Sequence, residues 1–299
     1  MSQIEIIEVS PRDGLQNEAV MFSTELKIEL ITRAVDTGFK RIEAASFVNP
    51  KRVPQMADGE AVMAGAPRDR GVRYVGLALN RKGFDRALAA GCDEINFVTV
   101  TTETFSQKNQ GASIKQNLDV WREIATEARA LGIPATLSIS AAFGCPYEGE
   151  VLHERVVDIA MLGAEAGPTE LIIADTIGCA VPTDVKALVR AIKVALPDIG
   201  LRCHFHDTRN TGLANAAAAV EAGVTGLDAS IGGIGGCPFA PGATGNIPTE
   251  DLVYMLHRMG HSTGLDLQGL VDVGRWLEEP LGRTVPAALP RAGIFPHAA

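Results

Sequence analysis

Strand-like runs separated by helix-like segments recur along the whole chain, and this alternation limits the possible folds more than any other feature. Eight runs are rich in Ile, Val and Leu, as strands covered on both faces are. They span residues 4–10, 41–47, 72–79, 94–100, 135–140, 170–175, 201–207 and 226–232. Eight strands that alternate with helices predict a (β/α)8 TIM barrel, and an open doubly wound sheet is the competing arrangement.

The segments between these runs have the signals of helices. Residues 23–38 begin with Ser and Thr at cap positions and end at Gly38, residues 113–132 also end in Gly, and residues 213–224 are rich in alanine. A pair ending in glycine, Ala-Gly or Leu-Gly, recurs at 90–91, 131–132, 162–163 and 222–223. We interpret each pair as a helix C-cap that leads into the next strand.

Length and composition favour one large domain. The chain has 299 residues, 46% of them hydrophobic and 21% charged, which is enough material for a large core. Barrels of this length form a single domain, and no linker or low-complexity segment divides the sequence. We therefore predict one catalytic domain over residues 1–299, with about 262–299 as a C-terminal helical extension.

Charge and cysteine usage limit the partners and the compartment. The net charge of −9 argues against broad binding to nucleic acid or to an acidic membrane surface. The sequence has no apolar run of 18 residues and no signal-peptide pattern at its start. The cysteines are odd in number, scattered and without a CxxC motif, which favours a reduced, cytoplasmic compartment over a disulfide framework. They are Cys92, Cys145, Cys179, Cys203 and Cys237.

Polar residues gather where the predicted strands end, which is where TIM barrels carry their active sites. Arg12 and Asp13 follow the first strand, and His204 and His206 end the seventh. Residues two apart on a strand point to the same face, so the two imidazoles can converge on one ion. The alternative is a pair of hydrogen-bonded histidines in the core, and the position at a strand end favours a metal pair.

Two oxygen donors can complete such a site. Asp13 would add a carboxylate, although an Asp before Gly is also a common turn residue. Asn246 would add an amide oxygen, although it can equally be a plain loop residue. Two imidazoles with these oxygens suit octahedral Mg²⁺ or Mn²⁺, whereas Zn²⁺ usually takes fewer ligands and often sulfur. Two histidines and one carboxylate can also bind Fe(II), which keeps an oxygenase among the alternatives.

The segment 232–246 is unusually rich in glycine and carries Cys237 near its middle. Glycine permits unusual backbone angles and the close approach of a ligand. The segment can therefore be a lid over the active site, or a rigid loop with an incidental thiol.

Six motifs resemble the 3-hydroxy-3-methylglutaryl-CoA lyase family, in the same order and over about residues 4–280. They are VSPRDGLQNE (9–18), SFVNPKRVPQM (46–56), GCPYEG (144–149), DTIG (175–178), HFHDT (204–208) and GGIGGCPFAPGATGNIPTEDLVYML (232–256). The Arg-Asp and His-x-His elements are shared with the isopropylmalate and homocitrate synthases. The cysteine-bearing glycine loop is specific to the lyases, so a condensing synthase is the weaker alternative.

The resemblance implies a role for each matched position. The cation ligands would be Asp13, His204, His206 and Asn246, and the catalytic residues Arg12, Asp13, Glu43, His204 and Cys237. The substrate-binding residues would be Gln16, Asn109, Asp175 and Thr176. Glu43 lies inside an apolar strand, where it needs a partner. A purely structural ion pair between Glu43 and Arg12 is the alternative to a catalytic duty.

The resemblance also implies a reaction, the cleavage of 3-hydroxy-3-methylglutaryl-CoA to acetyl-CoA and acetoacetate, in leucine catabolism and ketone-body formation. Mg²⁺ or Mn²⁺ would bind the substrate hydroxyl, Asp13 would accept its proton and Arg12 would stabilise charge on the thioester oxygen. Cys237 would protonate the enolate or shield it from water. Basic residues near strand ends could bind the phosphates of coenzyme A. They are Lys51, Arg52, Arg81, Lys82 and Lys108.

Several functional alternatives remain open from the sequence. A lyase for citramalyl-CoA or for a longer 3-substituted 3-hydroxyglutaryl-CoA would use the same residues. A metal-dependent hydrolase is a rival because His-x-His also occurs in amidohydrolase barrels, but there the pair belongs to the first strand. A non-catalytic binding protein is the last alternative. The family likeness makes a homodimer the expected oligomer.

Overall fold

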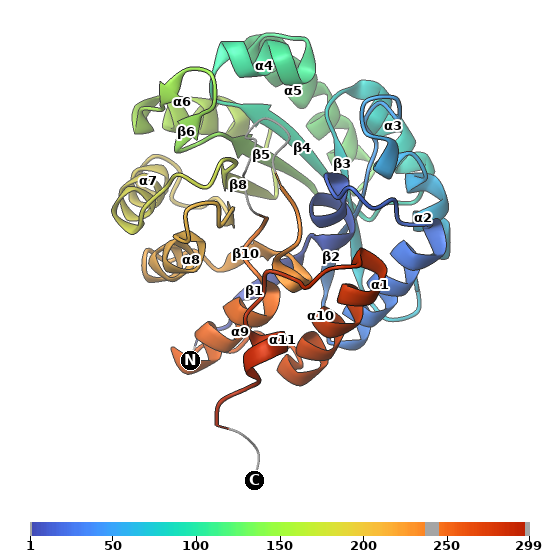
Figure 1. The fold of residues 1–299 in the computed structure, drawn as a ribbon. Helices are drawn as coiled ribbons and strands as arrows, with labels where there is room; N and C mark the ends of the chain where they lie inside the picture. Colours follow the sequence, from blue (N-terminus) through green and yellow to red (C-terminus); the bar gives the residue numbers. More distant parts are fainter. Residues whose placement is uncertain (1, 237–244, 297–299) are drawn as a thin grey trace.

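The computed structural model describes residues 2–236 and 245–296. Eight parallel strands form a closed barrel in the order β1-β2-β3-β4-β5-β8-β9-β10, and β10 pairs back onto β1 (Figure 1). The strands are β1 (Glu5–Glu8), β2 (Arg41–Ser46), β3 (Arg73–Ala78), β4 (Glu94–Val100), β5 (Ala135–Ser140), β8 (Glu170–Asp175), β9 (Leu201–Phe205) and β10 (Gly226–Ala229). All eight predicted strands are present, so the (β/α)8 barrel is confirmed and the open sheet is wrong.

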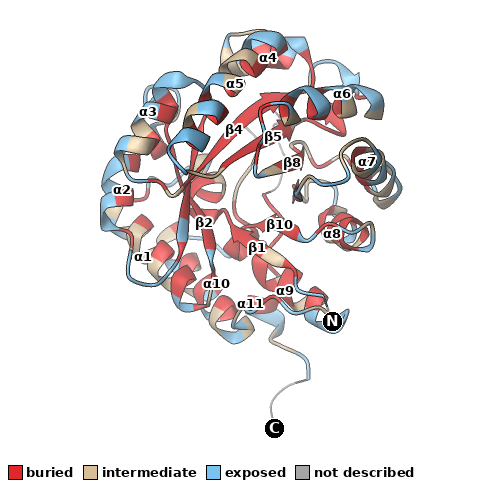
Figure 2. Ribbon diagram, turned by 180° about the vertical axis from the view of Figure 1, so that it is seen from behind, coloured by how far each residue is buried: buried red, intermediate tan, exposed pale blue. Residues whose placement is uncertain are grey.

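Helices surround the barrel and turn their apolar faces toward it, as the buried inner and exposed outer surfaces show (Figure 2). They are α1 (Thr24–Asp36), α2 (Gly59–Gly65), α3 (Arg81–Ala89), α4 (Glu103–Gln110), α5 (Ile114–Ala130), α6 (His153–Ala164), α7 (Pro182–Ala195), α8 (Gly212–Glu221) and α9 (Thr249–Arg258). The extra C-terminal helices α10 (Leu267–Leu281) and α11 (Leu289–Ala292) follow, and α10 packs on α1 and α9. A two-stranded hairpin of β6 (Gly144–Cys145) and β7 (Gly149–Glu150) follows β5.

The predicted helix boundaries are largely confirmed. The Ser23 side chain accepts a hydrogen bond from the Leu26 amide at the start of α1, and Ser113 forms a capping box with Gln116 at the start of α5. Glycines with positive φ follow α1, α3, α5 and α8, as the predicted end of the first helix and three of the four glycine-ended pairs require. They are Gly38, Gly91, Gly132 and Gly223.

One predicted cap is wrong. Gly163 lies inside α6, and the glycine with positive φ after that helix is Gly167. A Cβ on Gly163 would overlap the buried side chain of Leu137, and the Gly163 carbonyl accepts a hydrogen bond from the Trp121 indole. This glycine therefore allows a close approach of helix to strand.

Three strands end two or three residues earlier than the sequence predicts, and each early end shapes the active-site rim. After β1 the chain forms the π-helical turn η1 (Ser10–Gly14), in which the Val9 carbonyl accepts hydrogen bonds from the amides of residues 12–14. After β9, His206 forms an isolated bridge with Asn246. After β10 comes the short 3-10 turn η3 (Ile231–Gly233).

Charged side chains close the N-terminal end of the barrel, a feature that the sequence analysis does not predict. Arg41 of β2 pairs with Glu94 at 2.6 Å, Glu5 at 3.0 Å and Glu170 at 3.1 Å. Arg202 of β9 also pairs with Glu170, at 3.3 Å. This end of a TIM barrel serves stability, and the opposite end is free for chemistry. No helix in the described part of the chain is long and apolar enough to cross a bilayer.

Candidate metal centre and active site

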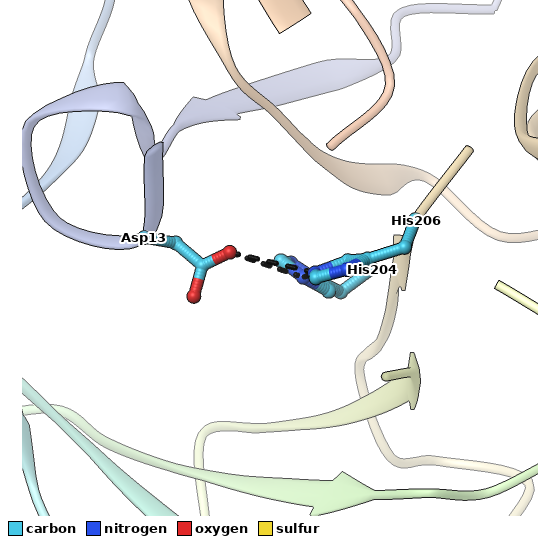
Figure 3. Close-up of side chains that lie close together, drawn as sticks. All are labelled: Asp13, His204 and His206. Carbon is cyan, nitrogen blue, oxygen red and sulfur yellow. Dashed lines mark hydrogen bonds and ion pairs between the residues drawn. The ribbon is translucent and has the colours of Figure 1, made fainter. Parts of the chain in front are cut away.

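Asp13, His204 and His206 converge at the C-terminal end of the barrel, from η1 and from the end of β9 (Figure 3). The Nε2 atoms of the two imidazoles lie 3.1 Å apart. Asp13 Oδ2 lies 3.5 Å from Nε2 of His206 and 3.8 Å from Nε2 of His204. Three donor atoms directed at one small space form a possible metal site, and their chemistry suits a divalent cation.

Asn246 lies beside this cluster, because its backbone bridges to His206. Its amide nitrogen donates to Asp13 Oδ2 at 2.9 Å and to the Ile234 carbonyl at 3.2 Å. Its Oδ1 is buried and accepts no hydrogen bond from the described residues. A buried amide oxygen without a donor is free to bind a cation, so Asn246 fits the ligand set that the resemblance implies.

The orientation of His204 is fixed from the opposite side by Asp228 of β10. Asp228 Oδ2 lies 3.2 Å from His204 Nδ1, and its Oδ1 lies 3.4 Å from Nε of Arg202. An ionised carboxylate only accepts hydrogen bonds, so His204 carries its proton on Nδ1 and presents the Nε2 lone pair to the cluster. The sequence analysis missed Asp228; its signal was an acidic residue inside an apolar strand.

The electrostatics around the cluster favour an ionised Asp13. Burial alone raises the pKa of Asp13, but Arg12 and the two imidazoles outweigh it and hold that pKa well below its usual range. Burial lowers the pKa of His204, but Asp228 and Asp13 outweigh it and raise that pKa. Asp13 is therefore an anion across the neutral range, as a metal ligand must be.

Arg12 is held between two carboxylates, since it forms ion pairs with Asp13 and with Glu43 of β2. The second oxygen of Glu43 accepts a hydrogen bond from Asn96 Nδ2 at 2.7 Å. Asn96 Oδ1 in turn accepts one from Ser138 Oγ at 2.9 Å. The predicted ion pair between Glu43 and Arg12 is present, and the sequence analysis missed Asn96 and Ser138 behind it.

A cavity of about 600 Å³ opens over the cluster. Seven of the predicted site residues line it: Arg12, Asp13, Gln16, Asn109, Thr176, His204 and His206. Of the basic residues proposed for coenzyme A, Arg52 and Lys108 line the cavity, whereas Arg81 pairs with Glu127 and Asp85. Lys51 and Lys82 are not among the lining residues.

Two predicted site residues have a different setting. The Asp175 carboxylate accepts hydrogen bonds at 2.9 Å from the backbone amides of Cys179 and Ala180, and Asp175 does not line the cavity. It holds the turn that follows Thr176. Cys237 and most of its glycine-rich segment lie outside the described residues.

Two buried glutamates hold the start of that segment in place. Glu250 of α9 accepts hydrogen bonds from the Gly232 amide at 2.9 and 3.0 Å. Glu8 of β1 accepts them from the Ile231 amide at 3.0 Å and from the Thr249 hydroxyl at 2.8 Å. Burial raises the pKa of Glu250 to about 8 and that of Glu8 to about 7. The sequence analysis did not find either residue.

The closed barrel and the Asp-His-His cluster at its C-terminal end define a TIM-barrel enzyme with a possible metal site. The HMGL-like family model matches residues 3–277, and the chain belongs to that family. It is 41% identical to the (R)-citramalyl-CoA lyase of Chloroflexus aurantiacus, covering 99% of this chain and 97% of that one. It is also 41% identical to the mitochondrial hydroxymethylglutaryl-CoA lyase of Gallus gallus, covering 97% of both.

A solved structure agrees with this assignment. The HMG-CoA lyase of Acinetobacter baumannii, in complex with coenzyme A and 3-methylmalate, is 39% identical to the chain. It matches with a TM-score of 0.95 over 99% of this chain and 97% of its own.

Proposed function

We propose that this protein is a divalent-metal-dependent lyase that cleaves 3-hydroxy-3-methylglutaryl-CoA to acetyl-CoA and acetoacetate. The observation that carries the proposal is the convergence of Asp13, His204 and His206 in one cavity. Full-length relatives with lyase names support it. A condensing synthase has less support because the relatives named above are lyases, and a hydrolase has less because the histidine pair ends β9 instead of β1.

The proposed cation is Mg²⁺ or Mn²⁺, held by Asp13, His204, His206 and Asn246. The mixed nitrogen and oxygen donors of these four residues suit these ions. A cation bound there would supply Lewis acidity that lowers the pKa of the tertiary hydroxyl of the substrate. We propose Asp13 as the acceptor of the hydroxyl proton, since its ionised carboxylate lines the cavity beside the two imidazoles.

The remaining steps use side chains around the cavity. As the bond between C2 and C3 breaks, the C3 oxygen becomes the ketone of acetoacetate and the electron pair moves to C2 as a thioester enolate. Arg12 is proposed to stabilise the negative charge on the thioester oxygen, because Glu43 fixes its guanidinium beside the cavity. Cys237 is proposed to protonate the enolate carbon or to shield it from water.

The rest of the cavity wall suits a coenzyme A thioester. Arg52 and Lys108 are proposed to contact the phosphates, and Gln16, Asn109 and Thr176 to bind the acyl and pantetheine parts. Asp175 is proposed to act on the substrate through the turn that it holds.

Citramalyl-CoA is the second candidate substrate, and the relative from Chloroflexus aurantiacus specifically favours it. It differs from the first candidate by one methylene between C3 and the carboxylate, and its cleavage would yield acetyl-CoA and pyruvate. A longer 3-substituted 3-hydroxyglutaryl-CoA would use the same residues.

We also propose a cytoplasmic, homodimeric enzyme of leucine catabolism and ketone-body formation in which residues 1–299 form one catalytic domain. The four described cysteines are unpaired, which suits a reducing compartment.

The test is turnover of the purified chain with each thioester after metal removal and after addition of Mg²⁺ or Mn²⁺. We expect acetoacetate from the first candidate, no product after chelation, and at least roughly 100-fold lower kcat in Asp13→Asn. Metal-independent product formation would contradict the proposal. Pyruvate from citramalyl-CoA, without acetoacetate from the first candidate, would select the second substrate.

A further inference from the structure

One part of the cavity wall is polar although it lies inside the barrel. It consists of Asn96 of β4 and Ser138 of β5, whose side chains are both buried and both line the cavity. The pair is joined by the hydrogen bond from Ser138 Oγ to Asn96 Oδ1, and Asn96 Nδ2 continues it to Glu43. The cavity wall and the Arg12–Glu43 ion pair are thus one connected network.

The strand positions beside this pair are apolar. Leu77 of β3 pairs in register with Asn96, and Val98 of β4 pairs with Ser138, and both line the same cavity. Branched apolar side chains usually fill such layers of a TIM barrel. The wall therefore has a polar and an apolar part, as does an acyl chain with a methyl group and a carboxylate.

The described residues do not use the full hydrogen-bonding capacity of Asn96. Its amide nitrogen has two hydrogens, and one of them binds Glu43. Ser138 fixes which way the amide faces, because its hydroxyl donates to the oxygen. The contacts with Glu43 and Ser138 fix the orientation of the amide, and its second N–H can donate to an anionic oxygen in the cavity. The negative charge of Glu43 is offset by Arg12 and does not repel such a ligand.

Resting on the lyase function above, we propose that Asn96 selects the substrate by donating a hydrogen bond to the free carboxylate of the 3-hydroxyacyl chain, and that Ser138 positions Asn96. A thioester without that carboxylate leaves the buried N–H unpaired. Sites built to hydrogen-bond a substrate reject analogues that lack the group far more strongly than apolar pockets reject a missing methylene.

The first test uses Ser138→Thr and Ser138→Val, which differ only by a hydroxyl against a methyl group, together with Asn96→Leu. The readout is the ratio of kcat/KM for 3-hydroxy-3-methylglutaryl-CoA and for 3-hydroxy-3-methylbutanoyl-CoA, which lacks the carboxylate. We expect Ser138→Thr to keep the ratio within about threefold, and Ser138→Val and Asn96→Leu to lower it by roughly tenfold or more.

A second readout does not depend on turnover. Calorimetry measures the affinity of each variant for Mn²⁺ alone and for citramalate, a free 2-hydroxydicarboxylate, in the presence of Mn²⁺. We expect Mn²⁺ affinity to be unchanged, and citramalate affinity to fall roughly tenfold in Asn96→Leu and Ser138→Val but not in Ser138→Thr.

The outcomes separate the two proposals. A wild-type protein that cleaves no thioester contradicts the lyase function, while the citramalate comparison still tests Asn96. If the wild type is active but Asn96→Leu and Ser138→Val leave the kcat/KM ratio and the citramalate affinity unchanged, the proposed role of Asn96 is wrong and the lyase function stands. A wild type that does not bind citramalate in the presence of Mn²⁺ also contradicts the proposed role of Asn96.

Discussion

Asp228 accepts a hydrogen bond from His204 Nδ1 across 3.2 Å, on the side of the imidazole opposite to Asp13 and His206. This contact joins the active site to the ion network at the other end of the barrel, since Asp228 also pairs with Arg202. The tautomer of the proposed ligand is therefore set by residues that are not themselves ligands.

Asp228→Asn should weaken metal binding while the fold is retained. The amide keeps the size of the side chain but removes the charge that holds His204 in one tautomer. We expect Mn²⁺ affinity to fall roughly 10- to 100-fold in calorimetry. Asp207→Asn is the matched control, because Asp207 accepts a hydrogen bond from the Gly212 amide and is not a proposed ligand. Equal affinities in wild type and Asp228→Asn would show that Asp228 does not orient His204.

Arg12→Lys should lower kcat without a comparable effect on metal binding. Lysine keeps the charge, but its ammonium cannot reproduce the planar guanidinium that contacts Asp13 and Glu43 together. We expect kcat to fall roughly 10²- to 10³-fold, as for the loss of one charge-stabilising donor. The same substitution in the exposed Arg33–Glu29 pair should change nothing. A variant with wild-type kcat would exclude Arg12 from charge stabilisation.

Gly245→Ala should disturb the active site through the backbone. A Cβ at this position would overlap the Gly233 carbonyl oxygen and lie 2.8 Å from the carbonyl carbon of Ile234. Relief of this overlap should displace the following residue, Asn246, from its contact with Asp13. We therefore expect a loss of stability of about 1–3 kcal/mol and weaker Mn²⁺ binding. Gly59→Ala, whose Cβ would meet only ordinary contacts, is the control. Calorimetry and urea unfolding would detect either effect, and unchanged values would contradict the prediction.

Glu250→Gln should flatten the pH dependence of stability. Burial raises the pKa of Glu250 from 4.5 to about 8, so the folded protein holds this proton more tightly than the unfolded chain. Its contribution to the free energy of unfolding is therefore highest below pH 4.5 and falls as pH rises toward 8, by at most about 5 kcal/mol.

Urea unfolding at several pH values from 4 to 8 would measure this difference between the wild type and Glu250→Gln. Part of the decline should remain in the variant, because burial also raises the pKa of Glu8, to about 7. Glu123→Gln on the exposed face of α5 is the control. Parallel curves for wild type and Glu250→Gln would contradict a proton held by Glu250.

The barrel and much of the candidate site could be predicted because their sequence signals are local or follow from the closure of the strands into a ring. Apolar runs located the strands, and strand alternation placed His204 and His206 on one face. A closed barrel then required η1 and the end of β9 to share a rim. The resemblance added Asn246 and Glu43, whose contacts with Asp13 and Arg12 the structure contains.

The supporting residues could not be predicted because their meaning depends on the register between strands. Asp228 contacts His204 only because β10 pairs with β9 at that position. Asn96 meets Glu43 and Ser138 across neighbouring and next-neighbouring strands. In the sequence Asp228 and Asn96 are each a polar residue beside apolar neighbours, with no partner in view. The first strand was predicted too long because hydrogen bonds of η1 to the Val9 carbonyl compete there with the sheet.

The pairing of β10 with β1 brings together two parts of the chain that are separated by most of its length. Asp13 and Asn246, which touch across this seam, are 233 residues apart. A nascent or truncated chain that has not closed the seam therefore lacks half of the oxygen donors. The proposed cation site is accordingly complete only once β10 has paired with β1, and Mn²⁺ binding would report that the ring of strands is closed.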